Sequence, residues 1–305
     1  MLDVIIIGGG LAGLTAGLYA NRAGLSTLLF EKMFVGGQAA TTYLIENYPG
    51  FEEPISGPDL SMKIESHARK FGLEIQYDEV TKIEMEGQVK RVHTENRVYE
   101  SRTLIIATGA EPKTLGLAKE DEFRGRGVSY CATCDGLFYK DKDVVVVGGG
   151  DTAVEDAEFL AQYVNKVYLV HRRDSFRANK TSSDRVMAND KIKVIWDTVV
   201  EEILGDENVT GVGIRNLKTG EKSQLKADGM FVAIGIVPNN DLVKGQLKQT
   251  EAGFVLTDEN MKTDIAGVFA AGDIRQKPLW QLVTAVSDGA IAAVSAQRYI
   301  IENFK

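Results

Sequence analysis

Apolar runs that do not alternate with polar residues recur along the chain and predict buried strands of parallel sheets. They occupy residues 2–7, 27–30, 103–107, 144–147, 167–170 and 267–271. Helical periodicity predicts helices over residues 12–23, 60–71, 152–163 and 281–300. Short alternating runs at residues 74–102 and 193–232 predict meanders of antiparallel strands.

The predicted elements follow the same order twice. Each half of the chain has a strand, a glycine-rich turn, a helix, a strand with a charged end, a meander and a further strand that runs into glycine. Strands that alternate with helices are typical of α/β folds with parallel sheets. The sequence therefore predicts two Rossmann-like dinucleotide-binding domains.

The first glycine-rich turn has the spacing of a dinucleotide fingerprint. It reads Gly8-Gly9-Gly10-Leu11-Ala12-Gly13, directly after the first strand. In this pattern Gly8 permits the tight turn, Gly10 lets a pyrophosphate approach the backbone and Gly13 lets helix and strand pack closely. Glu31 ends the next strand, where a carboxylate suits a ribose hydroxyl pair. The alternative is a glycine-rich turn in a fold without nucleotide.

The second turn differs in the residues that follow it. It reads Gly148-Gly149-Gly150-Asp151-Thr152-Ala153. Where Glu31 stood in the first half, the chain carries His171-Arg172-Arg173, with Arg177 four residues further on. Guanidinium groups pair bidentately with phosphate, so this change is typical of a site for a ribose 2′-phosphate. We expect NADPH here, bound through Gly148, Gly150, Ala153, His171, Arg172, Arg173 and Arg177; a solvated basic loop is the alternative.

Cys131 and Cys134 are the only cysteines of the chain. A bridge between them closes too short a loop to act as a structural staple, whereas a strained, reducible bridge at this spacing is typical of a redox pair. Zinc is an alternative, but it needs four ligands and only His67, His93 and His171 remain as partners, scattered along the chain. Inert thiols are the other alternative, and we expect no metal site.

Asp135 directly follows the second cysteine. A carboxyl beside a dithiol can carry the proton that a departing sulfur needs, so Asp135 is the candidate acid–base. The alternative is a turn residue before Gly136, since Asp-Gly is a common turn pair.

Composition narrows the classes of partner. The chain has 305 residues, enough for two domains, with 35 Lys and Arg against 43 Asp and Glu and a net charge of −8. This balance argues against binding to nucleic acid or to an anionic membrane. We read no signal peptide at the N-terminus and no apolar run of the ~20 residues that a membrane span needs. A cytoplasmic enzyme is the expectation.

Taken together, these motifs resemble the low-molecular-weight, bacterial-type thioredoxin reductases, a class of pyridine nucleotide-disulfide oxidoreductases, over essentially the whole chain. The most specific pieces are Cys131-Ala132-Thr133-Cys134-Asp135-Gly136 just before the second glycine turn, the arginine cluster, and Gly272-Asp273. The resemblance implies three-layer ββα domains, the second inserted into the first. An FAD-binding domain would comprise residues 1–112 and 243–305, and an NADPH-binding domain residues 113–242. It also implies a homodimer and thioredoxin as the protein substrate.

The resemblance further implies roles for single residues. Glu31 would hold the adenosine ribose, Gln38 and Asn47 the flavin side, Asp273 the ribitol, Gln281 a place near the isoalloxazine, and Cys134 a place against the flavin. The chain departs from the family at two positions: Leu11 stands where proline is frequent, and Trp280 precedes Gln281 where arginine is frequent.

The expected activity is NADPH-dependent disulfide reduction, with electrons passing from NADPH to FAD, to Cys131–Cys134 and to thioredoxin. Because nicotinamide and dithiol would share one domain and both need the flavin, we expect that domain to rotate about residues 113–116 and 238–241. The rivals are a ferredoxin-fed relative, a reductase for another thioredoxin-like or peroxiredoxin partner, and a non-enzymatic flavin-binding sensor. The second glycine turn and its arginines argue against the ferredoxin-fed relative.

Overall fold

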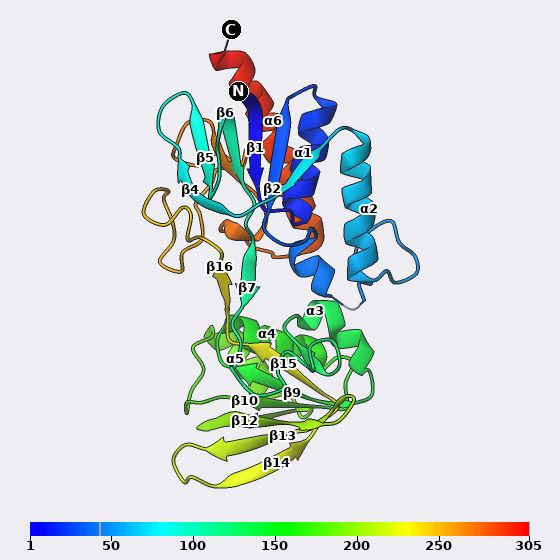
Figure 1. Cartoon of the computed structure of the whole chain (residues 1–305). Coiled ribbons are helices and arrows are strands. Elements are labelled where there is room, and N and C mark those ends of the chain that lie inside the picture. Colours follow the sequence, from blue (N-terminus) through cyan, green and yellow to red (C-terminus); the bar gives the residue numbers. More distant parts are fainter. Residues whose placement is uncertain (43, 305) are drawn as a thin grey trace. The chain divides into compact units, whose positions relative to one another are not determined.

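The structure, a computed structural model, describes residues 1–42 and 44–304. The chain forms two compact units (Figure 1). The first unit joins Met1–Glu111 to Val237–Lys305, and the second comprises Pro112–Ile236. The resemblance described above implies boundaries at 112/113 and 242/243.

The first unit is built on a seven-stranded sheet. Its parallel part has the order β3 (Glu74–Tyr77), β2 (Thr27–Glu31), β1 (Leu2–Ile7), β6 (Val98–Ile106), β17 (Val268–Ala270). Antiparallel strands β5 (Lys90–Thr94) and β4 (Val80–Glu84) extend from the first half of β6. The sequence had assigned β3 to the meander. It alternates in burial as a meander strand does, because it lies at the edge of the parallel sheet.

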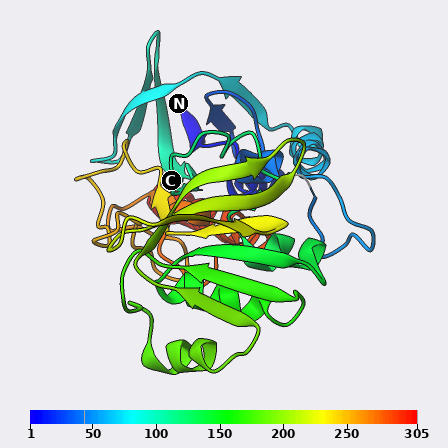
Figure 2. The same ribbon diagram turned by 90° about the horizontal axis from the view of Figure 1, so that it is seen from below.

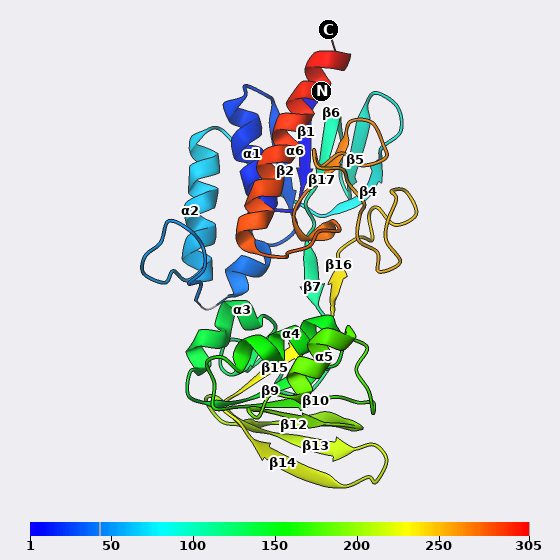
Figure 3. The ribbon, with the colours of Figure 1, turned by 180° about the vertical axis from the view of Figure 1, so that it is seen from behind.

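Helices cover one face of the parallel strands, and strands β4 and β5 pack over the other face. The helices are α1 (Leu11–Arg22), α2 (Gly57–Lys70) and α6 (Leu282–Asn303), with 3₁₀ turns η1 (Gly37–Thr41) and η3 (Gly272–Ile274). Ile6 of β1 packs in one cluster with helix residues Leu14 and Ala296, whereas its neighbour Ile5 packs in another with Val92 of the meander. Helices α1 and α6 run side by side in both views (Figures 1 and 3). The expected three layers are present.

The second unit repeats the parallel order with β11 (Ile192–Ile195), β10 (Lys166–Val170), β9 (Asp143–Gly148), β15 (Gly229–Ala233) and β8 (Val128–Ser129). Its helices are α3 (Ala132–Asp135), α4 (Asp151–Leu160) and α5 (Lys180–Met187), with the 3₁₀ turn η2 (Gly136–Tyr139). The meander is a separate sheet of β12 (Thr198–Gly205), β13 (Val209–Asn216) and β14 (Lys222–Lys226). Figure 2 shows its yellow-green strands beside the green strands of the parallel sheet.

Alternate side chains of β9 again face different layers. Val146 packs in one cluster with Leu160 of α4, and Val145 in another with Val212 of the meander. The α/β fold with two Rossmann-like domains is thus confirmed.

Local capping explains where some predicted helix boundaries differ. Helix α2 begins three residues before the predicted 60–71, because the Ser56 hydroxyl accepts a hydrogen bond from Asp59 N (3.1 Å) and Pro58 fits the first turn. Helix α5 was not predicted; Asn179 caps it, with Oδ1 accepting from Ser182 N (2.9 Å). Among the described helices, none combines the length and apolar composition that crossing a bilayer requires.

Two short strands lie where the chain passes from one unit to the other. They are β7 (Ala110–Pro112) and β16 (Ile236–Pro238), which pair in a two-stranded sheet. Flanking backbone hydrogen bonds join Lys113 N to Gly235 O (2.9 Å) and Asn239 N to Gly109 O (3.0 Å). The predicted hinge segment 113–116 directly follows β7, and the segment 238–241 begins at the last residue of β16.

Candidate redox centre and nucleotide-binding turns

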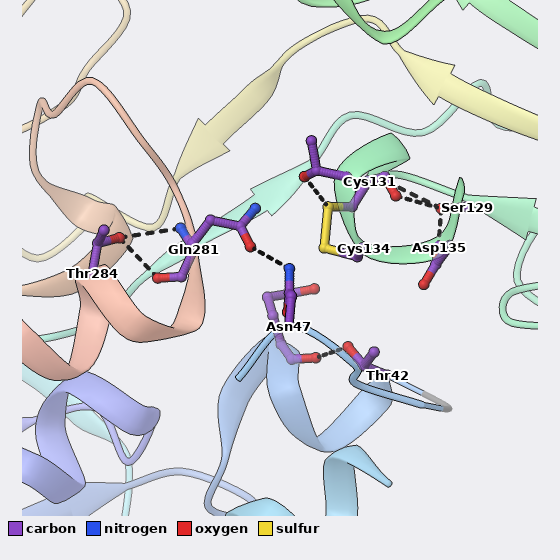
Figure 4. Close-up of a disulfide and its surroundings, with 10 residues drawn as sticks. Thr42, Asn47, Ser129, Cys131, Cys134, Asp135, Gln281 and Thr284 are labelled. Carbon is purple, nitrogen blue, oxygen red and sulfur yellow. Dashed lines mark hydrogen bonds between the residues drawn. A yellow bond between two sulfur atoms is a disulfide. The ribbon is translucent and has the colours of Figure 1, made fainter. Parts of the chain in front are cut away.

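Cys131 and Cys134 form a disulfide, with their Cα atoms 5.3 Å apart (Figure 4). Cys131 precedes the short helix α3, and its carbonyl accepts hydrogen bonds from Cys134 N (3.3 Å) and Asp135 N (3.1 Å). This single helical turn brings the two side chains of the C-x-x-C motif together. Such a pair can alternate between disulfide and dithiol.

Asp135 is joined to the Cys131 backbone through a hydrogen-bond network that the sequence did not reveal. The Ser129 hydroxyl donates to Asp135 Oδ2 (2.6 Å) and accepts a hydrogen bond from Cys131 N (3.1 Å) (Figure 4). Ser129 is 4% exposed and ends β8. Burial first, and then the charges of Asp135 and Asp228, raise the pKa of Tyr139 to about 12, so its hydroxyl keeps its proton at neutral pH. A two-residue strand has too little periodicity to have marked Ser129 beforehand.

The redox pair lies at the carboxyl edge of the second sheet. Strand β8 is parallel to β15, with Ser129 opposite Phe231, so the chain leaves this edge into Cys131. Strand β9 ends at the same edge in Gly148. In open parallel sheets, ligands bind outside this edge. The dithiol and the second glycine turn therefore share the ligand-binding side of one sheet.

Both glycine turns have the shape that a pyrophosphate requires. A Cβ on Gly8 (φ +106°) would lie 2.3 Å from the Ala107 carbonyl oxygen, and one on Gly148 2.4 Å from that of Ala233. By contrast, a Cβ on Gly10 or on Gly150 would meet no atom within 4 Å. Each turn thus packs tightly against its sheet at Gly8 or Gly148 and leaves open space at Gly10 or Gly150, which fits a dinucleotide.

Helices begin directly at these openings. Gly10 precedes α1 and Gly150 precedes α4, and neither helix start is capped by a side-chain hydrogen bond. The uncapped amide groups are suited to phosphate oxygens. Gly13 is needed for close packing, since a Cβ there would lie 1.9 Å from the Gly8 oxygen. Ala153 has the corresponding place in the second unit and is fully buried.

Glu31 holds the first turn through its carboxylate. Oε2 accepts from Gly9 N (2.8 Å) and Oε1 accepts from Met33 N (3.0 Å). The side chain is partly exposed at the end of β2. Each carboxylate oxygen can accept more than one hydrogen bond, so the group can also bind ribose hydroxyls.

His171 has the corresponding place in the second unit but behaves differently. It is 5% exposed, and a Cβ on Gly149 would lie 2.2 Å from its ring. Nε2 lies 3.1 Å from the Ser175 carbonyl oxygen. Burial first, and then Arg173, Arg177 and Arg172, lower the pKa of His171, so the ring is neutral at neutral pH. His171 therefore packs against the glycine turn at Gly149 as an uncharged ring and provides no positive charge there.

The three arginines of the same segment are exposed. The structure gives Arg172, Arg173 and Arg177 no ion pair with a carboxylate within residues 1–42 and 44–304. The Arg177 backbone N donates to the Gly149 carbonyl (2.8 Å), which ties this segment to the glycine turn. The guanidinium groups are therefore available to an anion near the turn.

On the first unit, segments far apart in sequence meet at Asn47 and Gln281. Asn47 Nδ2 donates to Gln281 Oε1 (3.1 Å) (Figure 4). Gln281 caps α6 in a reciprocal capping box with Thr284. The carbonyl of Gln38, in η1, accepts from the Thr42 hydroxyl (3.0 Å). Three of the residues predicted for the flavin side thus lie in one unit, two of them in direct contact.

Asp273 follows β17 and lies in a charged network that the sequence did not predict. Its Oδ1 is 2.8 Å from Lys277 Nζ, and the Lys277 side chain is only 3% exposed. Asp288 of α6 lies 3.4 Å from the same ammonium group and accepts from Gly272 N (3.1 Å). Asp288 stands among apolar residues in the sequence of a long helix, and this could have indicated a buried ion pair, because a buried charge needs a partner.

The remaining candidates have ordinary surroundings. Leu11 packs in an apolar cluster, and Trp280 packs on Phe254 (ring centroids 5.5 Å apart), with its Nε1 buried and without a hydrogen-bond partner among the described residues. His67 is exposed and His93 lies 3.2 Å from Glu84. Within the described part of the chain, no group of three or more His, Cys, Asp or Glu is placed to hold a metal ion.

Comparison with known proteins agrees with this geometry. The profile described as pyridine nucleotide-disulphide oxidoreductase matches residues 2–289. The thioredoxin reductase of Peptoclostridium acidaminophilum is 45% identical, covering 99% of this chain and 98% of its own. Among solved structures, thioredoxin reductase from Streptococcus pyogenes matches with a TM-score of 0.94 and 48% identity over 99% of both chains. That from Giardia duodenalis matches with 0.93 and 41% identity over 98% and 99%.

The matches extend over nearly the whole chain, including the parts of it that hold both glycine turns and the disulfide. The chain therefore belongs to the pyridine nucleotide-disulphide oxidoreductase family, in its low-molecular-weight thioredoxin reductase branch, and is an NADPH-dependent flavoprotein that carries FAD and reduces disulfides.

Proposed function

We propose that the two nucleotides are divided between the two units. The first unit would hold FAD through Gly8, Gly10, Gly13, Glu31, Gln38, Asn47, Asp273 and Gln281. The second would hold NADPH through Gly148, Gly150, Ala153, His171, Arg172, Arg173 and Arg177. The division is supported by the two open turns and by the residue that follows each of them, a carboxylate in one unit and arginines in the other.

When bound, FAD and NADPH would supply the two electrons that, together with two protons, convert the Cys131–Cys134 disulfide into a dithiol. One thiolate of the pair then attacks a disulfide of the partner protein, forming a mixed disulfide as the partner's own bond breaks. The second cysteine attacks the mixed disulfide, restoring Cys131–Cys134 and releasing the partner as a dithiol. Two protons pass to the partner's sulfurs, and Asp135 carries them between the sulfur atoms.

Thioredoxin is the partner that we assign to this dithiol. The relatives that match over the whole chain are named for its reduction. The net charge of −8 also agrees with a protein partner rather than nucleic acid or an anionic membrane. We place the enzyme in the cytoplasm, where reduced thiols are maintained.

We further propose a homodimer that forms through the first unit. Met33, Phe34 and Met62 are exposed by 69%, 52% and 56% and line one cavity on its surface. Grouped exposed apolar residues are typical of a protein interface. Size-exclusion chromatography with light scattering tests this, because a monomer mass at micromolar concentration contradicts it.

The paired strands β7 and β16 support rotation of the second unit. Both crossings between units run through this one two-stranded connection. The segments 113–116 and 238–241 can then change backbone angles together while each unit keeps its own core.

The observation that carries the function is the Cys131–Cys134 disulfide at the ligand-binding edge of a nucleotide-binding sheet. The test is anaerobic titration of the holoenzyme with NADPH while flavin absorbance is followed, then addition of oxidised thioredoxin. We expect bleaching by NADPH and stoichiometric reduction of thioredoxin. Bleaching by reduced ferredoxin but not by NADPH supports the ferredoxin-fed rival. Bleaching without reduction of thioredoxin contradicts the partner assignment.

A further inference from the structure

The segment 129–135, here called the redox loop, contains both cysteines, and the hydroxyl of its first residue, Ser129, contacts Cys131 and Asp135. Ser129 ends β8, where pairing with β15 fixes its backbone, and it is 4% exposed. Six residues later the chain returns to it, because the turn of α3 brings the Asp135 carboxylate back over the strand end. A hydroxyl this buried requires hydrogen-bond partners, and each of its partners belongs to the redox loop.

The contacts assign the direction of each hydrogen bond. Cys131 N can only donate, so the Ser129 oxygen accepts at 3.1 Å. The hydroxyl has one proton and two acceptors in reach, Asp135 Oδ2 at 2.6 Å and the Cys131 carbonyl at 3.4 Å. The shorter contact has the length of a charge-assisted bond to a carboxylate, so the proton points to Asp135.

We propose that Ser129 is a positioning residue for the proton-carrying step. Its hydroxyl fixes the position of the Asp135 carboxyl relative to the Cys131 backbone and favours the ionised form of that carboxyl. This inference rests on the proposed function of Asp135. In the step concerned, a thiol of the reduced pair gives its proton to Asp135, the resulting thiolate forms a bond to one partner sulfur, and the partner's other sulfur departs and receives that proton. Ser129 touches neither sulfur in this scheme.

The charges around the carboxyl agree with this role. Tyr139 of η2 remains protonated, as described above, because burial and the negative charges of Asp135 and of Asp228, before β15, raise its pKa. Neither Tyr139 nor Asp228 carries a positive charge. The Ser129 hydroxyl, by donating to the carboxylate, stabilises the charged form.

The test compares Ser129→Ala with Ser129→Thr, which keeps the hydroxyl, as pH profiles of holoenzyme turnover with oxidised thioredoxin. Removal of the hydroxyl raises the pKa of Asp135, so the acidic limb of kcat should move up by about one pH unit and turnover below it should fall about tenfold. Ser129→Thr should keep the wild-type limb. Anaerobic flavin reduction by NADPH should be unchanged in both variants.

Two further variants make the outcome decisive. Asp135→Asn should abolish the acidic limb, and adding Ser129→Ala to it should change little, because the two residues act as one unit. If Ser129→Ala does not fold, Asp135→Asn alone decides: an unchanged limb overturns the inference. So does a uniform loss at all pH values in Ser129→Ala. The same profiles with an aromatic disulfide such as dithiobis(nitrobenzoate) test Ser129 even if thioredoxin is not the partner.

Discussion

The two units share one strand order but obtain their fifth strand in different ways. In the first unit it is β17, which comes from the end of the chain, and in the second it is β8, which precedes the rest of the unit. Both are parallel to their neighbour, and both deliver a functional group at the carboxyl edge. That group is Asp273 in the first unit and the Cys131 disulfide in the second. In both units the parallel sheet determines where the side chain lies, at the carboxyl edge, and the chain segment that supplies the fifth strand determines which side chain it is.

The glycine turns show the same principle at the second strand. Glu31 and His171 stand at equivalent positions, each 18 residues after the end of its motif. Glu31 binds its turn by accepting from Gly9 N, whereas the His171 ring covers Gly149 without charge. One residue therefore both supports the turn and offers charge in the first unit. In the second unit these tasks are divided between His171 and the exposed arginines.

The largest effect is expected from substitution of the cysteines that follow β8, the fifth strand of the second unit. Cys131→Ser or Cys134→Ser should lower thioredoxin turnover by a factor of about 10³ or more, because a single thiol cannot complete the exchange. Both variants should still bleach with NADPH, since the nucleotide turns are untouched. Only Cys131→Ser should show a long-wavelength charge-transfer band, as Cys134 is assigned to the flavin side. Such a band only in Cys134→Ser reverses that assignment, and normal turnover in either variant refutes the dithiol mechanism.

The arginine cluster tests the division of tasks in the second unit. Removing Arg172 and Arg177 together should lower kcat/KM for NADPH about 10²-fold, because hydrogen bonds between charged groups each contribute about 1.5–3 kcal/mol. The value for NADH should change little. Arg215→Ala, in the meander and paired with Glu201, is the matched control. An equal loss with both nucleotides argues against binding of the 2′-phosphate.

Glu31 tests the corresponding position of the first unit. Glu31→Gln removes the charge and leaves one of two backbone N–H donors, Gly9 or Met33, without its acceptor. We expect FAD affinity to fall about tenfold, the effect of one lost charge-assisted bond, with the NADPH KM of the remaining holoenzyme unchanged. Flavin content after dialysis and equilibrium titration measure this, with exposed Glu79→Gln as control. Full retention of FAD excludes Glu31 as the ribose ligand.

Local patterns predicted what depends on local sequence. Apolar runs predicted most of the parallel strands, but not β3 and β11, which were assigned to the meanders, nor the two-residue strand β8. Glycine spacing predicted both turns, since a turn between strand and helix is decided by a few consecutive residues. Partners across long separations were not predictable in this way. Asn47 and Gln281 are 234 residues apart and meet only because α6 returns to the first unit. Ser129, Lys277 and Asp288 also act through tertiary contacts, which periodicity does not encode.

The smallest expected effect concerns the neutral ring that takes the place of Glu31 in the second unit. The pKa of His171 is lowered from an unfolded value near 6.5, mainly by burial. Below that value the unfolded chain binds more protons than the folded one, so stability falls as the pH drops from about 6.5 towards the lowered pKa, by at most about 1.4 kcal/mol per pH unit.

His171→Gln removes this titrating group and so tests whether a neutral ring in the second unit takes the place that the charged Glu31 has in the first. Thermal unfolding of the holoenzyme between pH 5 and 7.5 should show a shallower loss of Tm on acidification for His171→Gln than for the wild type. The absolute Tm falls as well, because the glutamine fills less of the space between Gly149 and Trp196; only the slope carries the argument. Exposed His67→Gln is the control and should keep the wild-type slope. If His171→Gln keeps it too, His171 is not buried as a neutral ring, and the contrast with the charged Glu31 turn does not hold in solution.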